Sequence, residues 1–447
     1  AGAKAAVSHT GALAGADSMY DALFTQTGVI RAQKFSDLLD IPVALSTGRV
    51  LHGKRVAILT STGGAGTLVS DSLGVCGFET PSPDPQTAQR LRALQSGDHA
   101  ALDRNPIDVT LAGLQPDLLR GAIRAVLDSP SYDALAIIVG SSSLAAPGLM
   151  ADAINDCLPL TDKPVLAYVS PHAPHVAALL NQRGVPAYTE PESCTVALEG
   201  MLQVARLNRP SALPTSIKPV STSDLPAGAL DEAQAKELFT RFGVPGVREI
   251  VICAPEQALE AARTLGSRVV LKILEKNIAH KSDIGGVAVN IMPEQASARL
   301  TEMKSRVKAK TGISINRFLV QEMVSGGVEL ILGFHRDPLG SAILLGMGGI
   351  TAELLNDTSM RLLPSHGGLS REEAMELMQE LKTWPLLNGF RGTPKADVEA
   401  LAAAIVSFSR MADQMGERLI EAEINPLFVL PCGEGVKAAD GIAILSA

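Results

Sequence analysis

Short apolar runs between residues 54 and 207 constrain the fold of this chain more than any other feature of its sequence. The runs are Val56–Thr60, Ala134–Val139 and Val165–Val169, and the helical patterns that accompany them are Pro116–Leu127, Leu149–Leu158 and His175–Arg183. No run alternates polar with apolar side chains, so each predicts a strand that is buried on both faces. Strands of this kind, interleaved with helices, are typical of a parallel sheet with helices on both sides. The sequence therefore predicts a doubly wound, flavodoxin-like α/β domain over residues 51–207.

Residues 208–227 are rich in proline, serine and threonine without periodicity, and they predict a linker. A helix that Asp231 can cap begins the next segment, which continues as a mixed series of strands with one long helix. The strand-like runs are Val269–Leu274, Val287–Ile291, Phe318–Met323, Glu329–Phe334 and Ala342–Leu345, and the helix is Pro293–Lys308. Because this pattern is α+β rather than doubly wound, residues 228–447 are predicted to form a separate domain.

The first 50 residues contain two short helical patterns. One is Asp17–Phe24, and the other runs through Ala44 with Ser36 as its expected N-cap. So short a segment cannot bury its own apolar face. We expect it to be either the tail of a larger domain or an arm that packs on the following one.

Charge and cysteine content argue against several classes of protein. The net charge of −8 disfavours nucleic-acid binding, because no basic stripe is present to neutralise phosphates. No apolar run reaches the roughly 20 residues that a membrane helix needs. The five cysteines are widely spaced and form no CxxC pair, which favours reduced thiols over a disulfide framework or a zinc site. We therefore expect a cytoplasmic protein that binds neither nucleic acid nor membrane.

Two segments rich in small residues could bind a phosphoryl group. His9 lies in a turn of small residues that leaves room around its ring. The turn Thr62–Thr67 follows a buried strand and begins a helix, so its backbone N–H groups and the helix dipole favour an anion. Two alternatives remain open: His9 could be an ordinary surface residue, and the turn could be a tight strand-to-helix connection without a ligand.

The second half of the chain contains charged residues in unusual positions. Lys272 lies inside an apolar strand, where burial is costly unless it meets an anion, and a phosphate is the interpretation we favour over snorkelling to a sheet edge. His280 precedes a lysine, an aspartate and a Gly-Gly turn. Asn425, with two glutamates on the same short strand, and Asp440 offer the hard oxygen ligands that suit Mg²⁺.

Taken in order, these segments make the chain similar to the ADP-forming acetate–CoA ligase (NDP-forming acyl-CoA synthetase) family, relatives of succinyl-CoA synthetase. The motifs are Ser8–Gly15, Thr60–Gly66, Asn105–Thr110, Leu271–Ile273 with His280–Val287, Gly346–Asp357, Gly389–Gly392 and Glu423–Leu427. The resemblance covers essentially the whole chain. It implies that residues 228–447 form an ATP-grasp domain and that residues 1–50 are the C-terminal tail of a further flavodoxin-like domain.

The same resemblance implies a role for individual residues. His9 matches the phosphorylated histidine, His280 a second relay histidine, and Thr62–Thr67 a helix N-terminus that holds the phosphoryl group. The residues implied in phosphate binding are Thr62, Gly63, Gly64, Ala65, Gly66 and Thr67, and those implied in nucleotide binding are Lys272, Glu322, Met323, Val324, Glu329, Gly346, Gly348 and Gly349. Asn425 and Asp440 match the Mg²⁺ ligands.

The implied reaction interconverts acyl-CoA, ADP and phosphate with a carboxylic acid, CoA and ATP. The family's CoA-binding domain would precede Ala1, so we expect a CoA-binding domain or subunit as partner, in a homo- or hetero-oligomer. Two alternatives are a regulatory, ligand-binding module like that of protein lysine acetyltransferases and an inactive nucleotide-binding subunit. The presence of His9 counts against the regulatory module.

Overall fold

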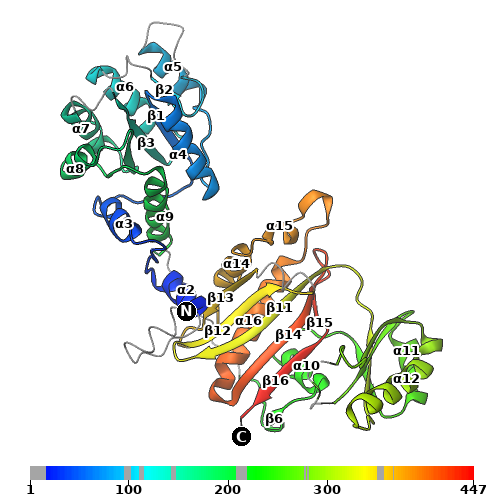
Figure 1. Cartoon of the computed structure of the whole chain (residues 1–447). Coiled ribbons are helices and arrows are strands. Elements are labelled where there is room, and N and C mark those ends of the chain that lie inside the picture. The colour runs from blue at the N-terminus through cyan, green and yellow to red at the C-terminus, as the bar shows by residue number, and fades with distance from the viewer. Residues whose placement is uncertain are drawn as a thin grey trace. The chain divides into compact units, whose positions relative to one another are not determined.

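The structure is a computed structural model that describes residues 17–94, 102–109, 115–141, 147–207, 219–275, 278, 281–349, 357–365 and 367–446. The chain divides into two compact units (Figure 1). One is Phe24–Pro210, which we call the parallel-sheet unit, and the other combines Ala1–Leu23 with Ser211–Ala447, which we call the antiparallel-sheet unit. The domain boundaries predicted at residues 50, 207 and 227 stay predictions.

The parallel-sheet unit is built on a five-stranded sheet in the order β2-β1-β3-β4-β5, with every neighbouring pair parallel. The strands are β1 (Val56–Thr60), β2 (Ile107–Asp108), β3 (Ala134–Val139), β4 (Val165–Val169) and β5 (Ala187–Tyr188). The helices are α3 (Asp37–Leu45), α4 (Gly63–Val75), α5 (Pro85–Ala93), α6 (Pro116–Leu127), α7 (Pro147–Asn155), α8 (Pro174–Gln182) and α9 (Pro191–Leu207), with the 3₁₀ turn η3 (Leu158–Leu160). This order confirms the predicted doubly wound domain.

Both faces of this sheet are covered, which explains why its strands do not alternate in polarity. In β1, Ala57 and Leu59 pack with residues of α5, α6, α7 and α8. Val56 and Ile58 point the other way and pack with residues of α3, α4 and α9. Successive side chains of a strand point to opposite faces, so a strand between two helical layers needs apolar residues at every position.

Two local predictions in this unit were wrong. Ser36 does not cap α3, because its backbone is already in the helical region and its side chain makes no capping hydrogen bond. The Asp37 carboxylate instead accepts hydrogen bonds from the backbone N–H groups of Gln33 and Lys34, at 2.9 and 2.8 Å. Helix α7 ends at Asn155 rather than continuing through Leu158, which begins η3. Helix α2 (Asp17–Thr27) precedes α3.

The antiparallel-sheet unit contains two sheets (Figure 1). The smaller sheet has the order β7-β10-β8-β9, and the larger has β13-β12-β11-β14-β16-β6 with β15 paired to β14. The strands are β6 (Gly228–Ala229), β7 (Glu249–Ile252), β8 (Val269–Ile273), β9 (Val287–Ile291), β10 (Phe318–Glu322), β11 (Val328–Asp337), β12 (Gly340–Met347), β13 (Thr358–Leu362), β14 (Leu419–Val429), β15 (Val436–Ala438) and β16 (Gly441–Leu445). All of these pairs are antiparallel, as the predicted α+β class requires.

Helices cover these two sheets separately. Helices α11 and α12 share one apolar core with the smaller sheet, whereas α10, α14 and α16 share another with the larger sheet. The helices are α10 (Glu232–Arg241), α11 (Ala258–Leu265), α12 (Pro293–Thr311), α14 (Arg371–Gln379), α15 (Trp384–Leu387) and α16 (Val398–Met415), with 3₁₀ turns η4 (Pro255–Gln257), η5 (Phe390–Gly392) and η6 (Gly416–Arg418). Within the described residues, no helix combines the length and apolarity that crossing a bilayer requires.

The hairpin of β11 and β12 is longer than its apolar pattern suggested. Pairing runs from Leu330 with Met347 to Asp337 with Gly340, so it includes polar residues at the turn end. Backbone hydrogen bonds continue where the side chains no longer need to be buried, and a hydrophobic pattern cannot detect that continuation. Gly346 therefore lies inside β12, one residue beyond the predicted strand Ala342–Leu345.

Asp231 caps helix α10 as predicted. Its Oδ1 accepts a hydrogen bond from the Gln234 N–H at 3.0 Å, and Gln234 Oε1 accepts from the Asp231 N–H at 3.0 Å. This reciprocal capping box satisfies two N–H groups at the helix start. It fixes the first turn of α10, in which Glu232 is buried together with Lys236 one turn later.

We expect Asp231→Ala to lower the free energy of unfolding of the antiparallel-sheet unit by about 0.5–2 kcal/mol, because the first turn loses its cap. Asp231→Asn should cost less, since its amide oxygen can still accept the hydrogen bond. Trp384, the single tryptophan, packs on the core of this unit, so its fluorescence during denaturant unfolding measures the change. Equal losses in the two variants would contradict the capping interpretation.

Candidate functional site

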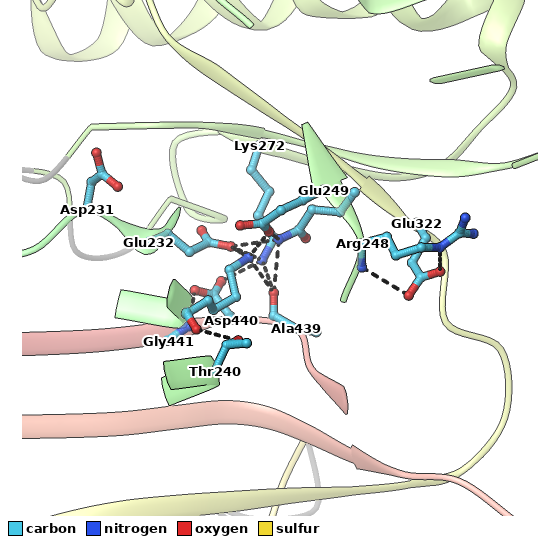
Figure 2. Close-up of polar contacts among 12 residues, drawn as sticks. Asp231, Glu232, Thr240, Arg248, Glu249, Lys272, Glu322, Ala439, Asp440 and Gly441 are labelled. Carbon is cyan, nitrogen blue, oxygen red and sulfur yellow. Dashed lines mark hydrogen bonds and ion pairs between the residues drawn. The ribbon is translucent and has the colours of Figure 1, made fainter. Parts of the chain in front are cut away.

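A buried carboxylate lies at the centre of the polar contacts in the antiparallel-sheet unit (Figure 2). The side chain of Glu232 is only 1% exposed, and it contacts the ammonium groups of three lysines. The distances from its carboxylate oxygens are 3.0 Å to Lys236 Nζ, 2.8 Å to Lys272 Nζ and 2.6 Å to Lys281 Nζ. Oε1 also accepts a hydrogen bond from Gln321 Nε2 at 3.1 Å. We call these five side chains the Glu232 cluster.

Lys272 projects from β8 and lies between two carboxylates. Its Nζ is 2.8 Å from Glu232 Oε1 and 2.8 Å from Asp440 Oδ2, and it donates to the Ala439 carbonyl oxygen at 3.0 Å. The sequence predicted that this buried lysine meets an anion, and the carboxylates of Glu232 and Asp440 are those anions. Charge compensation no longer requires a phosphate, so a phosphate contact for Lys272 stays a prediction.

Electrostatics hold this group of residues in its charged form. Burial by itself would raise the pKa of Glu232, but the ammonium groups of Lys272, Lys236 and Lys281 bring that pKa well below its ordinary value. Burial would likewise lower the pKa of Lys272, yet the carboxylates of Glu232 and Asp440 raise it overall. Both groups are therefore ionised at neutral pH.

A second carboxylate, that of Glu249 on β7, lies next to the Glu232 cluster. Glu249 Oε2 pairs with Lys236 Nζ and accepts from Gln321 Nε2, the latter at 2.8 Å. Glu232 and Lys236 are not among the predicted site residues, although their spacing on the helix could have revealed them. The two residues stand four positions apart on a helix face whose other members, such as Phe239, are apolar. A charged pair on such a face indicates a buried ion pair.

Asn425 and Asp440 are neighbours, as the sequence predicted for a Mg²⁺ site. Asn425 lies on β14 and Asp440 directly precedes β16, and the Asn425 N–H donates to the Asp440 carbonyl oxygen at 3.2 Å. Asn425 Nδ2 donates to Glu423 Oε1 at 3.2 Å, which orients the amide. The Asp440 side chain is 30% exposed.

Carboxylate and amide oxygens fit a magnesium ion, which also needs oxygens from phosphate or water. The described part of the chain contains no group of three or more His, Cys, Asp and Glu side chains that could hold a metal. Asn425 and Asp440 would thus bind magnesium only together with another ligand, such as a nucleotide. Their role as metal ligands stays a prediction.

Glu322, Met323 and Val324 are predicted to bind the nucleotide, and we call them the hinge. The side chain of Glu322 is used within the protein. Its carboxylate lies 2.8 Å from Arg248 Nε and 2.6 Å from Lys437 Nζ. Burial would raise the pKa of Glu322, but the hydrogen bonds from Lys437 and Arg248 lower it overall. Because this carboxylate is occupied, contacts of the hinge with a base would use backbone groups. Met323 is 40% exposed beside it.

The glycines after β12 pack closely against β11 at Glu329. Gly348 N–H donates to the Glu329 carbonyl oxygen at 2.8 Å, and a Cβ at Gly348 would lie 3.1 Å from the Glu329 backbone. Gly349 has a φ of +70°, and a Cβ there would lie 2.9 Å from Glu329 Oε2. Packing against backbone therefore favours glycine at position 348, and the positive φ favours it at position 349, whether or not a nucleotide binds. Gly346, on β12, pairs with Ile331 and Thr358.

In the parallel-sheet unit, the turn Thr62–Thr67 connects β1 to α4 as predicted. Thr62 occupies the N-cap position but makes no side-chain capping hydrogen bond. A Cβ at Gly63 or Gly64 would meet no atom within 4 Å. The first turn of α4 is therefore sterically open at these two glycines, which suits a ligand of the size of phosphate. Gly66 differs, since its Cβ would lie 3.1 Å from Pro106 Cβ.

Asn105 binds strand β1, which leads into the same turn, and it is not among the predicted site residues. Its Oδ1 accepts a hydrogen bond from Ile58 N–H at 3.0 Å, and its Nδ2 donates to the Val56 carbonyl oxygen at 2.8 Å. The side chain thus pairs with β1 as a neighbouring strand would, and it holds Pro106 against Gly66. His9 and His280, the two predicted catalytic histidines, lie outside the described residues.

Comparison with known proteins gives two family matches. The profile of the family described as ATP-grasp domain matches residues 224–444. The profile of the family described as succinyl-CoA ligase like flavodoxin domain matches residues 1–45. Together with the two kinds of sheet, these matches confirm the predicted fold class, a flavodoxin-like doubly wound domain followed by an α+β ATP-grasp domain.

Several relatives are similar in sequence. Acetate–CoA ligase (ADP-forming) I of Archaeoglobus fulgidus is 27% identical over 97% of this chain and 63% of its own length. 4-Hydroxybutyrate–CoA ligase (ADP-forming) of Nitrosopumilus maritimus is 29% identical over 98% of this chain and 64% of its own length. The beta subunit of acetate–CoA ligase (ADP-forming) I of Pyrococcus furiosus is 36% identical over 44% of this chain and 85% of the subunit. The chain therefore spans just under two thirds of the first two relatives.

We expect Gly348→Ala to destabilise the antiparallel-sheet unit by about 1–3 kcal/mol, because the new methyl group meets the backbone of β11. If the segment of Gly348 and Gly349 binds nucleotide phosphate, ADP affinity measured by calorimetry should also fall. Gly312→Ala is the matched control, since Gly312 has a φ of +73° in open space at the end of α12. It should cost about 1–2 kcal/mol of stability and leave ADP affinity unchanged. A stable, unperturbed Gly348→Ala would contradict the packing argument.

Proposed function

The chain belongs to the ADP-forming acetate–CoA ligase family, and from this premise we propose that it acts in an NDP-forming acyl-CoA synthetase. The reversible reaction is acyl-CoA + ADP + phosphate ⇌ carboxylic acid + CoA + ATP. The main support is Lys272, a charged lysine that lies 2.8 Å from Asp440, whose carbonyl oxygen accepts a hydrogen bond from Asn425 N–H. Such a pairing suits the phosphates of a magnesium–nucleotide.

The proposed chemistry moves one phosphoryl group through covalent intermediates. A phosphate oxygen attacks the thioester carbonyl, the C–S bond breaks, and CoA leaves as the thiol after taking a proton. A nitrogen of His9 then attacks phosphorus in the acyl phosphate, and the P–O bond breaks to release the carboxylate. A nitrogen of His280 then attacks phosphorus as the N–P bond to His9 breaks. An oxygen of the ADP β-phosphate finally attacks phosphorus as the N–P bond to His280 breaks. Dividing the transfer in this way replaces one difficult step by easier ones.

The residues of the antiparallel-sheet unit would bind and orient the nucleotide. In this proposal Lys272 and the glycines Gly348 and Gly349 contact its phosphates, and the backbone of Glu322–Val324 contacts its base. Asn425 and Asp440 would hold Mg²⁺, which neutralises phosphate charge when bound. Groups fixed in advance by the protein stabilise the charge of a moving phosphoryl group without reorganisation.

The turn Thr62–Thr67 would hold the phosphoryl group on the acyl-phosphate side of the reaction. Its support is the uncapped, sterically open first turn of α4 at Gly63 and Gly64. Several backbone N–H groups and the helix dipole would act on the anion together.

A CoA-binding domain or subunit is part of the proposal. Relatives in Pyrococcus furiosus are named as separate alpha and beta subunits of acetate–CoA ligase, and this chain matches both kinds. We propose that this chain works with such a domain or subunit in an oligomer, on a small carboxylic acid and its CoA thioester. We also place it in the cytoplasm, because all five cysteines are free thiols.

Phosphohistidine formation tests the proposed function directly. Incubation of the full chain with ATP labelled in its γ-phosphate should give a protein label that is stable to base and labile to acid. His280→Asn should abolish the label, whereas His172→Asn should not, since His172 is an exposed histidine beside Glu190. Nucleotide binding without any label would contradict the synthetase and support a regulatory module or an inactive subunit instead.

Removal of the metal gives a second test. EDTA should abolish labelling, and Asp440→Asn should raise the magnesium concentration for half-maximal labelling by about tenfold or more, because a charged ligand becomes neutral. Glu434→Gln, on an exposed turn, is the matched neutralisation and should have no effect. If excess magnesium fails to restore labelling in Asp440→Asn, the residue is not acting as a metal ligand.

A further inference from the structure

The two carboxylates on Lys272 differ sharply in their exposure. The Glu232 side chain is 1% exposed, whereas that of Asp440 is 30% exposed. A nucleotide or a metal ion can therefore reach Asp440 but not Glu232. Glu232 uses both of its oxygens on protein groups, since Oε1 contacts Lys272 and Oε2 contacts Lys281.

We propose that Glu232 is a positioning residue for the nucleotide site, whose buried carboxylate holds the ammonium groups of Lys272 and Lys281 where nucleotide phosphates bind. This inference rests on the proposed function, because it assumes that Lys272 contacts a phosphate. Glu232 would not touch the nucleotide itself. It would act only through the two lysines.

Lys272 needs a second carboxylate because a magnesium ion would compete with it for Asp440. If Asp440 held a magnesium ion, Lys272 would have one anionic partner fewer. A buried ammonium group without a partner is costly and would move toward water. Glu232 is buried and already paired with Lys272, so it would still hold that lysine in position.

Lys281 extends the argument to a second segment of the chain. It lies 2.6 Å from Glu232 Oε2, on the far side of the carboxylate from the oxygen that meets Lys272. The carboxylate thus binds a lysine from β8 and a lysine from the turn that precedes β9. Close ammonium groups repel each other, and a shared buried carboxylate is what allows both to stay charged.

The test compares ADP binding to the full chain and its variants by calorimetry at neutral pH, with magnesium present. Glu232→Gln keeps the shape of the side chain and removes its charge. We expect ADP affinity to fall at least about tenfold. Glu232→Asp, which keeps the charge on a shorter side chain, should give an intermediate affinity.

Glu249→Gln is the matched control, because Glu249 is a carboxylate in the same surroundings that pairs with Lys236 and Gln321. It should leave ADP affinity unchanged. Unchanged binding in folded Glu232→Gln, or an equal change in Glu249→Gln, would overturn the inference. In a Lys272→Met, Lys281→Met background, Glu232→Gln should have less than about a twofold further effect on affinity.

Two further outcomes are distinguishable. If Lys272→Met itself leaves ADP affinity unchanged, the proposed nucleotide site fails and the inference fails with it. If Lys272→Met weakens binding while Glu232→Gln does not, the inference alone fails. Should Trp384 fluorescence show that Glu232→Gln does not fold, Glu232→Asp decides: wild-type ADP affinity in that variant would overturn the inference.

Discussion

A carboxylate that is removed from water must be compensated by the protein, and Glu232 imposes this condition on every element around it. Helix α10, strand β8, strand β10 and the turn before β9 each contribute a group that contacts it. Breaking a buried ion pair by removing one partner typically costs about 3–5 kcal/mol, and three lysines share the compensation of this carboxylate. The elements are thus held together by an electrostatic requirement as well as by apolar packing, and the capping box of Asp231 fixes the helix turn from which Glu232 projects.

The same condition divides the carboxylates of this unit by accessibility. Glu232 lies deep in the structure and holds lysines in place, whereas the partly exposed Asp440 can be reached by a ligand. Glu322 illustrates the intermediate case, since two cations occupy its carboxylate beside the partly exposed Met323. For the turn at Gly63 and Gly64 we propose anion binding by backbone groups, because an open helix start can bind an anion without any charged side chain.

Sequence patterns predicted the fold wherever burial alone decides the structure. The strands β1, β3 and β4 were found with their observed bounds because each is buried on both faces. Patterns failed where backbone pairing or local hydrogen bonds decide. Gly346 belongs to a strand because the β11–β12 ladder continues past the apolar run. Ser36 fails as a cap because its backbone is already helical, and no composition rule reveals a single dihedral angle.

By itself, the sequence determined the two classes of domain, the cap of α10, the open turn before α4, and the nearness of Asn425 to Asp440. Each of these depends on residues close in sequence or on a periodic pattern of burial. Only the tertiary structure decided that Lys272 is neutralised by Glu232, which stands 40 residues away. It also decided that Asn105 serves as a neighbour of β1, 47 residues from its partner Ile58. Contacts across such distances follow from how whole elements pack, and no local pattern encodes which charged side chains that packing brings together.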